Sequence, residues 1–182
     1  MAAPQRWFAF LRAINVGGHV VKMDRLRALF AELGFANVAT FIASGNVIFD
    51  AAAADASALE AQIEAHLRQA LGYEALTFVR SAADLAAIAS YTPFTAAGGA
   101  HGMYVSFLKA PLGAAARTQL LALNSDNDEF HAHGREFYWL CRTRLSDSPL
   151  FSGGLLAKAV GVPTTMRNSS TIQKLAAKYG LA

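Results

Sequence analysis

One stretch decides the fold, residues 7–50, which reads WFAFLRAINVGGHVVKMDRLRALFAELGFANVATFIASGNVIFD. It begins with a compact apolar run (7–14) that contains several aromatic residues, a pattern typical of a β-strand. After a glycine loop, apolar residues recur every three or four positions as far as Gly34, which predicts an amphipathic helix. Two more apolar runs, 37–44 and 46–50, meet at a short polar turn and predict a β-hairpin.

The next forty residues extend this pattern to a complete α+β unit. Ser57 and Glu60 have the spacing of a capping box, and a stripe of leucine and isoleucine residues behind them predicts a second helix. Residues 74–80 then form a further apolar run that predicts a strand, and Ser81 begins another helix. The order β-α-β-β-α-β is that of a ferredoxin-like unit, in which two helices cover one face of a four-stranded antiparallel sheet.

The same order of elements returns after residues 92–101, a linker rich in small residues, glycine and proline. Two tandem ferredoxin-like units are therefore expected, at residues 1–91 and 102–182. The elements predicted for the second are a strand at 102–110, a helix from Pro111, a hairpin of 128–133 with 135–141, a helix from Ser148-Pro149 to Gly161, a strand at 162–167, and a terminal helix with a capping box of Ser170 and Gln173.

Composition narrows the class of protein. The chain has 182 residues, 54% of them hydrophobic, which is enough for buried cores. No apolar run approaches the length of a transmembrane helix, and Arg12 interrupts the N-terminal run too early for a signal peptide, so a cytoplasmic protein is expected. The single cysteine, Cys141, excludes an internal disulfide and lies in an apolar run, which predicts a buried thiol.

The net charge of +3 conceals an uneven distribution along the chain. Residues 1–49 carry five basic and two acidic side chains, residues 50–129 carry four basic and nine acidic, and residues 130–182 carry seven basic and two acidic. One interpretation is that these are ordinary solvated surfaces. The other is that the two basic ends meet around an anionic ligand.

Several motifs resemble a known family. They are LRAINVGG (Leu11–Gly18), SGNVIF (Ser44–Phe49) and TMRNSST (Thr165–Thr171). Together they resemble the bacterial family designated domain of unknown function 1697. The resemblance implies an α+β, ferredoxin-like fold in a soluble bacterial protein, and no established activity. The chain departs from the family pattern at Ala13, where glycine is usual, and at Ser169-Ser170, which replace Trp-Asn.

The first group of candidate ligand-binding residues lies between the first strand and the first helix. Arg12 is expected on the strand, where a charge among apolar neighbours needs a partner or a ligand. Gly17 and Gly18 can expose backbone N–H groups to an anion, and Asn15 can orient it. A tight turn with a solvated arginine remains the simpler alternative. Ser44 and Asn46 either serve only the hairpin turn or point toward the same site as Asn15.

The second group lies at the start of the terminal helix. Arg167 and Lys174 would neutralise an anion, while Asn168 and Thr171 would orient it. The alternative is a capped helix with solvated charges. If both groups form one site, a small anionic, phosphate-bearing ligand is expected where the 11–18 loop and the 165–174 segment approach each other.

Two other functions remain open. A single-stranded RNA- or DNA-binding module would use Phe8, Phe10 and Phe49 on open sheet faces, although the diagnostic third-strand motif is missing. A non-enzymatic assembly or regulatory domain would pair its sheets with another chain.

Catalytic and metal motifs are weak. Glu129, His131 and His133 alternate on one strand without an evident fourth ligand, so no metal site is expected. No nucleophile with a base partner can be named, and no cofactor is indicated. Membrane association is not expected, and the oligomeric state is open.

Overall fold

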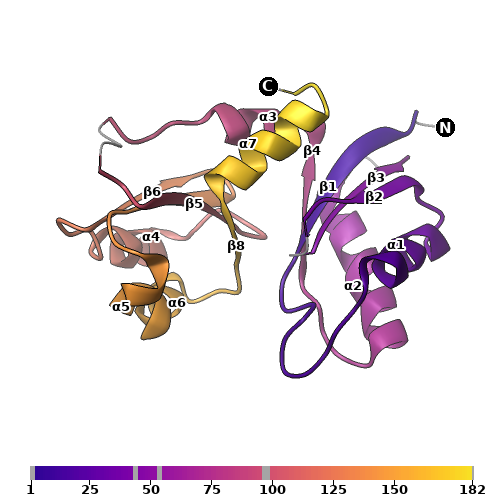
Figure 1. The fold of residues 1–182 in the computed structure, drawn as a ribbon, viewed down its shortest axis with the longest axis horizontal. Coiled ribbons are helices and arrows are strands. Elements are labelled where there is room, and N and C mark those ends of the chain that lie inside the picture. Colours follow the sequence, from indigo (N-terminus) through magenta and orange to yellow (C-terminus); the bar gives the residue numbers. More distant parts are fainter. Residues whose placement is uncertain (1–2, 43–44, 53–54, 96–98, 182) are drawn as a thin grey trace. The chain divides into compact units, whose positions relative to one another are not determined.

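A computed structural model of the chain describes residues 3–42, 45–52, 55–95 and 99–181. These residues form an α+β protein with two four-stranded antiparallel sheets and seven α-helices (Figure 1). None of the described helices is both long and apolar enough to cross a membrane. The chain divides into two units: the first runs to Ile88 and includes Lys178–Leu181, and the second runs from Ala89 to Ala177.

The first unit contains the sheet with strand order β2-β3-β1-β4, in which every neighbouring pair is antiparallel. Helix α1 connects β1 to β2, and helix α2 connects β3 to β4. The elements are β1 (Gln5–Leu11), α1 (Met23–Glu32), β2 (Ala36–Thr40), β3 (Asn46–Ala51), α2 (Ala56–Leu71), β4 (Thr77–Ser81) and α3 (Ala82–Ser90).

Helices α1 and α2 cover one face of this sheet. Their inward stripes, which include Leu29, Phe30 and Ile63, are fully buried against alternate residues of β1 and β3 such as Ala9 and Phe49. The alternation follows from the two-residue period of a strand, which sends every second side chain to the same face. The helical stripes predicted from the sequence are therefore confirmed as the core of this unit.

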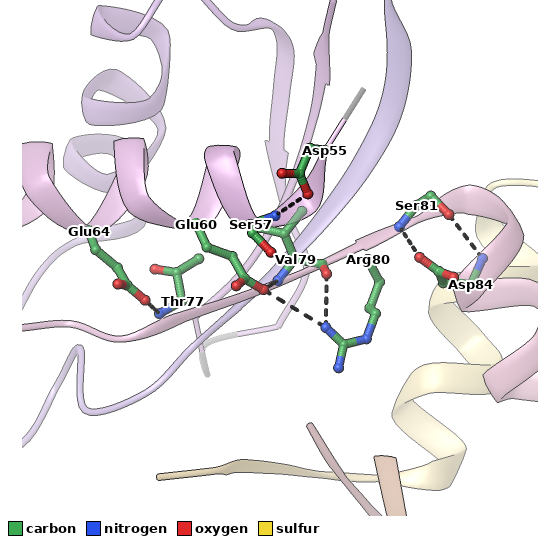
Figure 2. A network of polar contacts seen from close by, with 9 residues as sticks. All are labelled: Asp55, Ser57, Glu60, Glu64, Thr77, Val79, Arg80, Ser81 and Asp84. Atoms are coloured by element: carbon green, nitrogen blue, oxygen red, sulfur yellow. Dashed lines mark hydrogen bonds and ion pairs between the residues drawn. The ribbon is translucent and has the colours of Figure 1, made fainter. Parts of the chain in front are cut away.

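Strand β4 forms one edge of the sheet, and helix α2 closes that edge with side chains (Figure 2). Glu64 Oε1 accepts a hydrogen bond from the Thr77 N–H at 2.7 Å, and Glu60 Oε1 accepts one from the Val79 N–H at 2.8 Å. At the end of the strand, a carboxylate oxygen of Asp84 accepts from the Ser81 N–H at 3.0 Å. Carboxylates thus occupy three alternate amides that an unprotected edge strand would offer to another chain.

The second unit repeats the arrangement, with strand order β6-β7-β5-β8. Its elements are β5 (Gly102–Phe107), α4 (Ala114–Leu121), β6 (Asp128–His133), β7 (Glu136–Cys141), a 3-10 turn (Leu145–Asp147), α5 (Pro149–Ser152), α6 (Leu155–Val160), β8 (Thr165–Asn168) and α7 (Ser169–Lys178). Leu120, Leu150 and Val160, from α4, α5 and α6, pack with Trp139 and the buried Cys141 of β7.

The structure corrects several element boundaries. Helix α4 begins at Ala114 rather than Pro111, and the helix expected from Ser148 to Gly161 is two short helices interrupted at Gly153-Gly154. The capping box of Ser57 and Glu60 is wrong: Asp55 caps α2 by accepting from the Ser57 N–H at 2.9 Å. The Glu60 carboxylate accepts from the Val79 N–H of β4.

Candidate functional site

Arg12 lies beyond the end of its strand. Strand β1 ends at Leu11, and the side chain of Arg12 is exposed, so the prediction that Arg12 sits among apolar residues of a strand is wrong. The physical reason is the backbone at Ala13, which turns to φ 60° and leads the chain out of the sheet. Arg12 remains attached to the sheet through its N–H, which donates to the Leu76 carbonyl at 2.7 Å.

The loop between β1 and α1, residues 12–22, is held in shape by its own polar groups. Asn15 Oδ1 accepts a hydrogen bond from the Val21 N–H at 2.7 Å, and the Tyr73 hydroxyl donates to the Ile14 carbonyl at 2.8 Å. The ring of His19 stacks on Tyr73 with 4.0 Å between centroids. Asn15 therefore has a structural role in closing the loop.

Gly17 and Gly18 form the exposed tip of this loop. Both have left-handed backbone, with φ 63° and 83°, and a Cβ at either position would meet no atom within 4 Å. Within the part of the chain that the structure describes, no acceptor is bonded to either N–H group. Two adjacent N–H groups are thus open to solvent, as in the backbone cradles that bind anions.

Basic side chains flank the same loop. Arg12 and Lys22 are exposed at its two ends, and residues 1–23 of the sequence include no acidic residue. Helix α1 begins immediately after Lys22 with no side-chain cap on its first N–H groups. Uncapped helix N–H groups carry partial positive charge, so the loop and helix start together favour an anion.

Asn46, at the start of β3, does not join this group. Asn46 is 1% exposed and donates from Nδ2 to the Phe41 carbonyl at 2.8 Å, which gives it the role of closing the β2–β3 connection. The connection between β2 and β3 is longer than the short turn predicted from the sequence, because β2 ends at Thr40. Ser44 lies outside the described residues.

The 165–174 segment belongs to the second unit. Arg167 is buried in β8, and its guanidinium donates to Thr165 Oγ1 at 2.8 Å and to the Met166 carbonyl at 2.9 Å. Desolvation by burial lowers the pKa of Arg167 to about 10. Its burial and its internal bonds give this cation a structural role in β8.

The other three residues of this segment begin helix α7. Asn168 Oδ1 accepts from both the N–H and the hydroxyl of Ser170, at 2.9 and 2.7 Å, and so acts as the cap of the helix. Thr171 is half-buried and Lys174 is exposed. Since this segment and the β1–α1 loop lie in different units, the idea that they serve one ligand stays a prediction.

The aromatic residues invoked for nucleic-acid stacking are not exposed. Phe49 lies on the helix-covered face of its sheet, where its ring stacks on Phe35 at 4.5 Å between centroids. Phe8 and Phe10 are 0% exposed, and the ring of Phe8 contacts Tyr179 edge-on. The assignment of Phe49 to an open face is therefore wrong, because its strand position places it opposite α1 and α2.

Comparison with known proteins gives a family and a structural relative. Residues 5–138 match the family described as "Protein of unknown function (DUF1697)". The chain belongs to the DUF1697 family. A solved structure, the conserved bacterial protein SP0830 from Streptococcus pneumoniae, is similar with a TM-score of 0.74 at 22% identity, covering 98% of this chain and 99% of that one. No protein in the curated search matches the chain.

Two residues of this DUF1697 protein have local features that the sequence does not reveal. Ala13 has φ 60°, a left-handed conformation in which alanine bears a steric cost that glycine would not. Ser169 is 9% exposed, and its Oγ has no hydrogen-bond partner among the described residues.

Sequence reasoning also missed a cluster in the second unit of this DUF1697 protein. His131 and His133 alternate on β6 as predicted, but Tyr91, forty residues earlier, lies against both rings. No group of three or more metal-ligating side chains gathers in the described part of the chain. Only the fold brings Tyr91 to these histidines, so no local signal could have found the cluster.

Proposed function

We propose that the protein binds a small anionic, phosphate-bearing ligand on the β1–α1 loop. One observation carries the proposal: the open N–H groups of Gly17 and Gly18 lie in a loop flanked by exposed Arg12 and Lys22. Backbone N–H groups next to a helix start hold phosphate oxygens through directed hydrogen bonds, and the cations supply long-range attraction.

The internal bonds of the loop favour binding, because a ligand does not have to order it. The hydrogen bond between Asn15 and Val21 closes the loop. Tyr73 also stabilises it, through a hydrogen bond to the Ile14 carbonyl and a ring stack with His19. A preorganised loop loses little conformational entropy when an anion binds. Asn15 is thus a positioning residue, and Arg12, Gly17 and Gly18 are the residues that would touch the anion.

An NMR titration of the full-length ¹⁵N-labelled protein with inorganic phosphate tests the proposal. The amide signals of Gly17 and Gly18 should shift and saturate, and Arg12→Gln should weaken the affinity about tenfold. Arg144→Gln is the matched control, since it removes the same charge from an exposed residue of the second unit. Unmoved glycine signals would refute the proposal.

The same titration distinguishes a nucleic-acid ligand. A mixed single-stranded oligonucleotide that shifts the glycine signals, with an affinity that falls steeply with salt, would assign the loop to a nucleic-acid backbone. Inorganic phosphate binding without oligonucleotide binding would assign it to a small molecule.

For the fold, we propose that each unit is ferredoxin-like. The orders β2-β3-β1-β4 and β6-β7-β5-β8 place the first and third strands of each unit at the centre, and a helix follows the first strand in both. The second unit differs because two short helices, α5 and α6, replace the single helix that precedes its last strand.

A further inference from the structure

Strand β6 forms an outer edge of the sheet in the second unit, and the chain that leads into it covers only its first half. The Ser125 N–H donates to the Asp128 carbonyl at 2.8 Å. Asn124 Oδ1 accepts from the Phe130 N–H at 2.7 Å. Both contacts lie on the side of β6 that faces away from β7, because alternate residues of an antiparallel strand direct their N–H and C=O groups to the same side.

Ala132 follows in the same alternation, on the uncovered half of the edge. Its N–H and C=O point away from β7, as the Phe130 N–H does. In the part of the chain that the structure describes, neither group has a hydrogen-bond partner. A hollow of about 190 Å³ borders residues 131–134, so this half of the strand is not packed tightly against the chain around it.

The β4 edge of the first unit differs in this respect. There, carboxylates of α2 and α3 accept from the alternate amides of the strand (Figure 2). Strand edges that keep open N–H and C=O groups are the places where a sheet adds a strand from another chain. Ala132 is therefore the centre of a potential strand-pairing surface.

The open stretch is complementary to a second copy of itself. When two β6 strands pair antiparallel about a two-fold axis at Ala132, each Ala132 N–H meets the Ala132 carbonyl of the other copy. The same register places the Gly134 N–H opposite the outward carbonyl of Phe130. Four hydrogen bonds result, and the bond between Phe130 and Asn124 is kept in each copy. The small side chains of Ala132 and Gly134 let the two backbones approach.

The charges at the two ends of β6 fit this antiparallel register. Glu129 lies near the start of the strand, and Arg135 lies in the turn that follows it. Glu129 of one copy is thus brought beside Arg135 of the other, twice by symmetry, and such opposite-charge pairs stabilise neighbouring strands. The Glu129 side chain is 43% exposed and accepts from Arg142 at 3.3 Å, so a second cation can approach it. Between the two charge pairs, His131 lies opposite His133.

We propose that β6 is a homodimer interface, in which two copies of the chain join their second units through an antiparallel β6–β6 pair centred on Ala132. A second copy fits better than an unrelated peptide, because the two-fold axis matches the open backbone groups and the opposite charges at once. The paired stretch is short and buries little surface, so the dimer forms reversibly and depends on concentration. This inference is independent of the β1–α1 loop.

Sedimentation velocity of the full-length protein, from about 1 μM to about 1 mM, tests the proposal. The native chain should change from monomer to dimer across this range. Ala132→Pro removes the N–H at the axis, at an edge position where a strand tolerates proline, and should weaken the dimer at least about tenfold with an unchanged circular dichroism spectrum. A native chain that stays monomeric throughout would overturn the proposal, as would a folded Ala132→Pro variant that dimerises with native affinity.

A charge exchange tests the register without proline. Glu129→Lys places like charges side by side twice and should weaken the dimer about tenfold. Adding Arg135→Glu to this variant restores opposite charges and should recover most of the lost affinity. Glu74→Lys makes the same charge change at an exposed residue of the first unit and should leave dimerisation unchanged. A double variant that dimerises no better than Glu129→Lys alone would refute the proposed pairing.

Discussion

Glu60 of helix α2 accepts a hydrogen bond from the backbone N–H of Val79 in strand β4, at 2.8 Å, and both residues are buried. The same Oε1 atom lies 3.9 Å from the guanidinium of Arg80, which is 0% exposed. One carboxylate thus closes a strand edge and balances a buried cation (Figure 2). It couples the helix to the sheet through a polar contact inside an apolar layer.

Glu60→Ala should lower the free energy of unfolding by about 3–5 kcal/mol, because it removes the acceptor of Val79 and the counter-charge of Arg80. Glu60→Gln keeps an oxygen acceptor and should cost less, about 1–2 kcal/mol. Urea unfolding of both variants measures the difference. Equal stabilities for the two variants would contradict this expectation, because they would show that the hydrogen bond from Val79 contributes nothing beyond the charge of the carboxylate.

Glu64→Ala is a milder change on the same edge. Glu64 accepts from the Thr77 N–H at 2.7 Å but is only half-buried, so its removal lets water reach the strand. The expected loss is about 1 kcal/mol in urea unfolding. A loss as large as that of Glu60→Ala would contradict the role assigned to burial.

Asp55→Ala should destabilise the protein by about 1 kcal/mol, since Asp55 Oδ1 caps helix α2. Ser57→Ala is the matched control, because the side chain that caps helix α2 is that of Asp55. Thermal unfolding of the two variants distinguishes them. A larger loss for Ser57→Ala would restore the capping box predicted from the sequence.

Ala13→Gly should raise the free energy of unfolding by about 0.5–1 kcal/mol, because glycine adopts φ 60° without a Cβ clash. The opposite effect is expected for Ala65→Gly, in the exposed middle of helix α2, which should cost about 1 kcal/mol. Urea unfolding measures both. A lower free energy of unfolding for Ala13→Gly would contradict the prediction. It would mean that the added conformational entropy of the unfolded chain outweighs the steric strain relieved in the folded loop.

Ser169→Ala should stabilise the protein by about 1 kcal/mol, because it removes a buried hydroxyl that has no hydrogen-bond partner among the described residues. Ser170→Ala should give no such gain, since its hydroxyl donates to Asn168. Differential scanning calorimetry compares the two. A destabilised Ser169→Ala variant would show that the hydroxyl has a partner.

Features of the fold that depend on residues close together in the sequence were predicted best. The hairpin of β6 and β7 follows from local alternation and from Gly134, which takes φ 57° in the turn, so it was predicted. The strand predicted at 162–167 overlaps β8, which begins only at Thr165 and extends to Asn168. Helix α4 begins later than predicted, because Gly113 rather than Pro111 precedes its first turn.

The candidate site was less predictable, because it depends on backbone angles and on long-range contacts. Arg12 looked buried by alternation, and only the left-handed residue after it shows why it is exposed. Asn46 and Asn168 carry the residue type of a ligand-binding group, yet their amides bond to Phe41 and Ser170. Turn and cap chemistry uses the same polar side chains as ligand recognition, so the pattern alone does not separate them.

The last residues of the chain belong to the unit that is synthesised first. Lys178–Leu181 group with the N-terminal unit, where Tyr179 packs edge-on against Phe8 at 5.5 Å and under the guanidinium of Arg6 at 5.0 Å. Domains generally fold during synthesis as they leave the ribosome, N-terminal unit first. The first unit therefore lacks one of its aromatic contacts until the segment that carries Tyr179 has been synthesised, after the whole of the second unit.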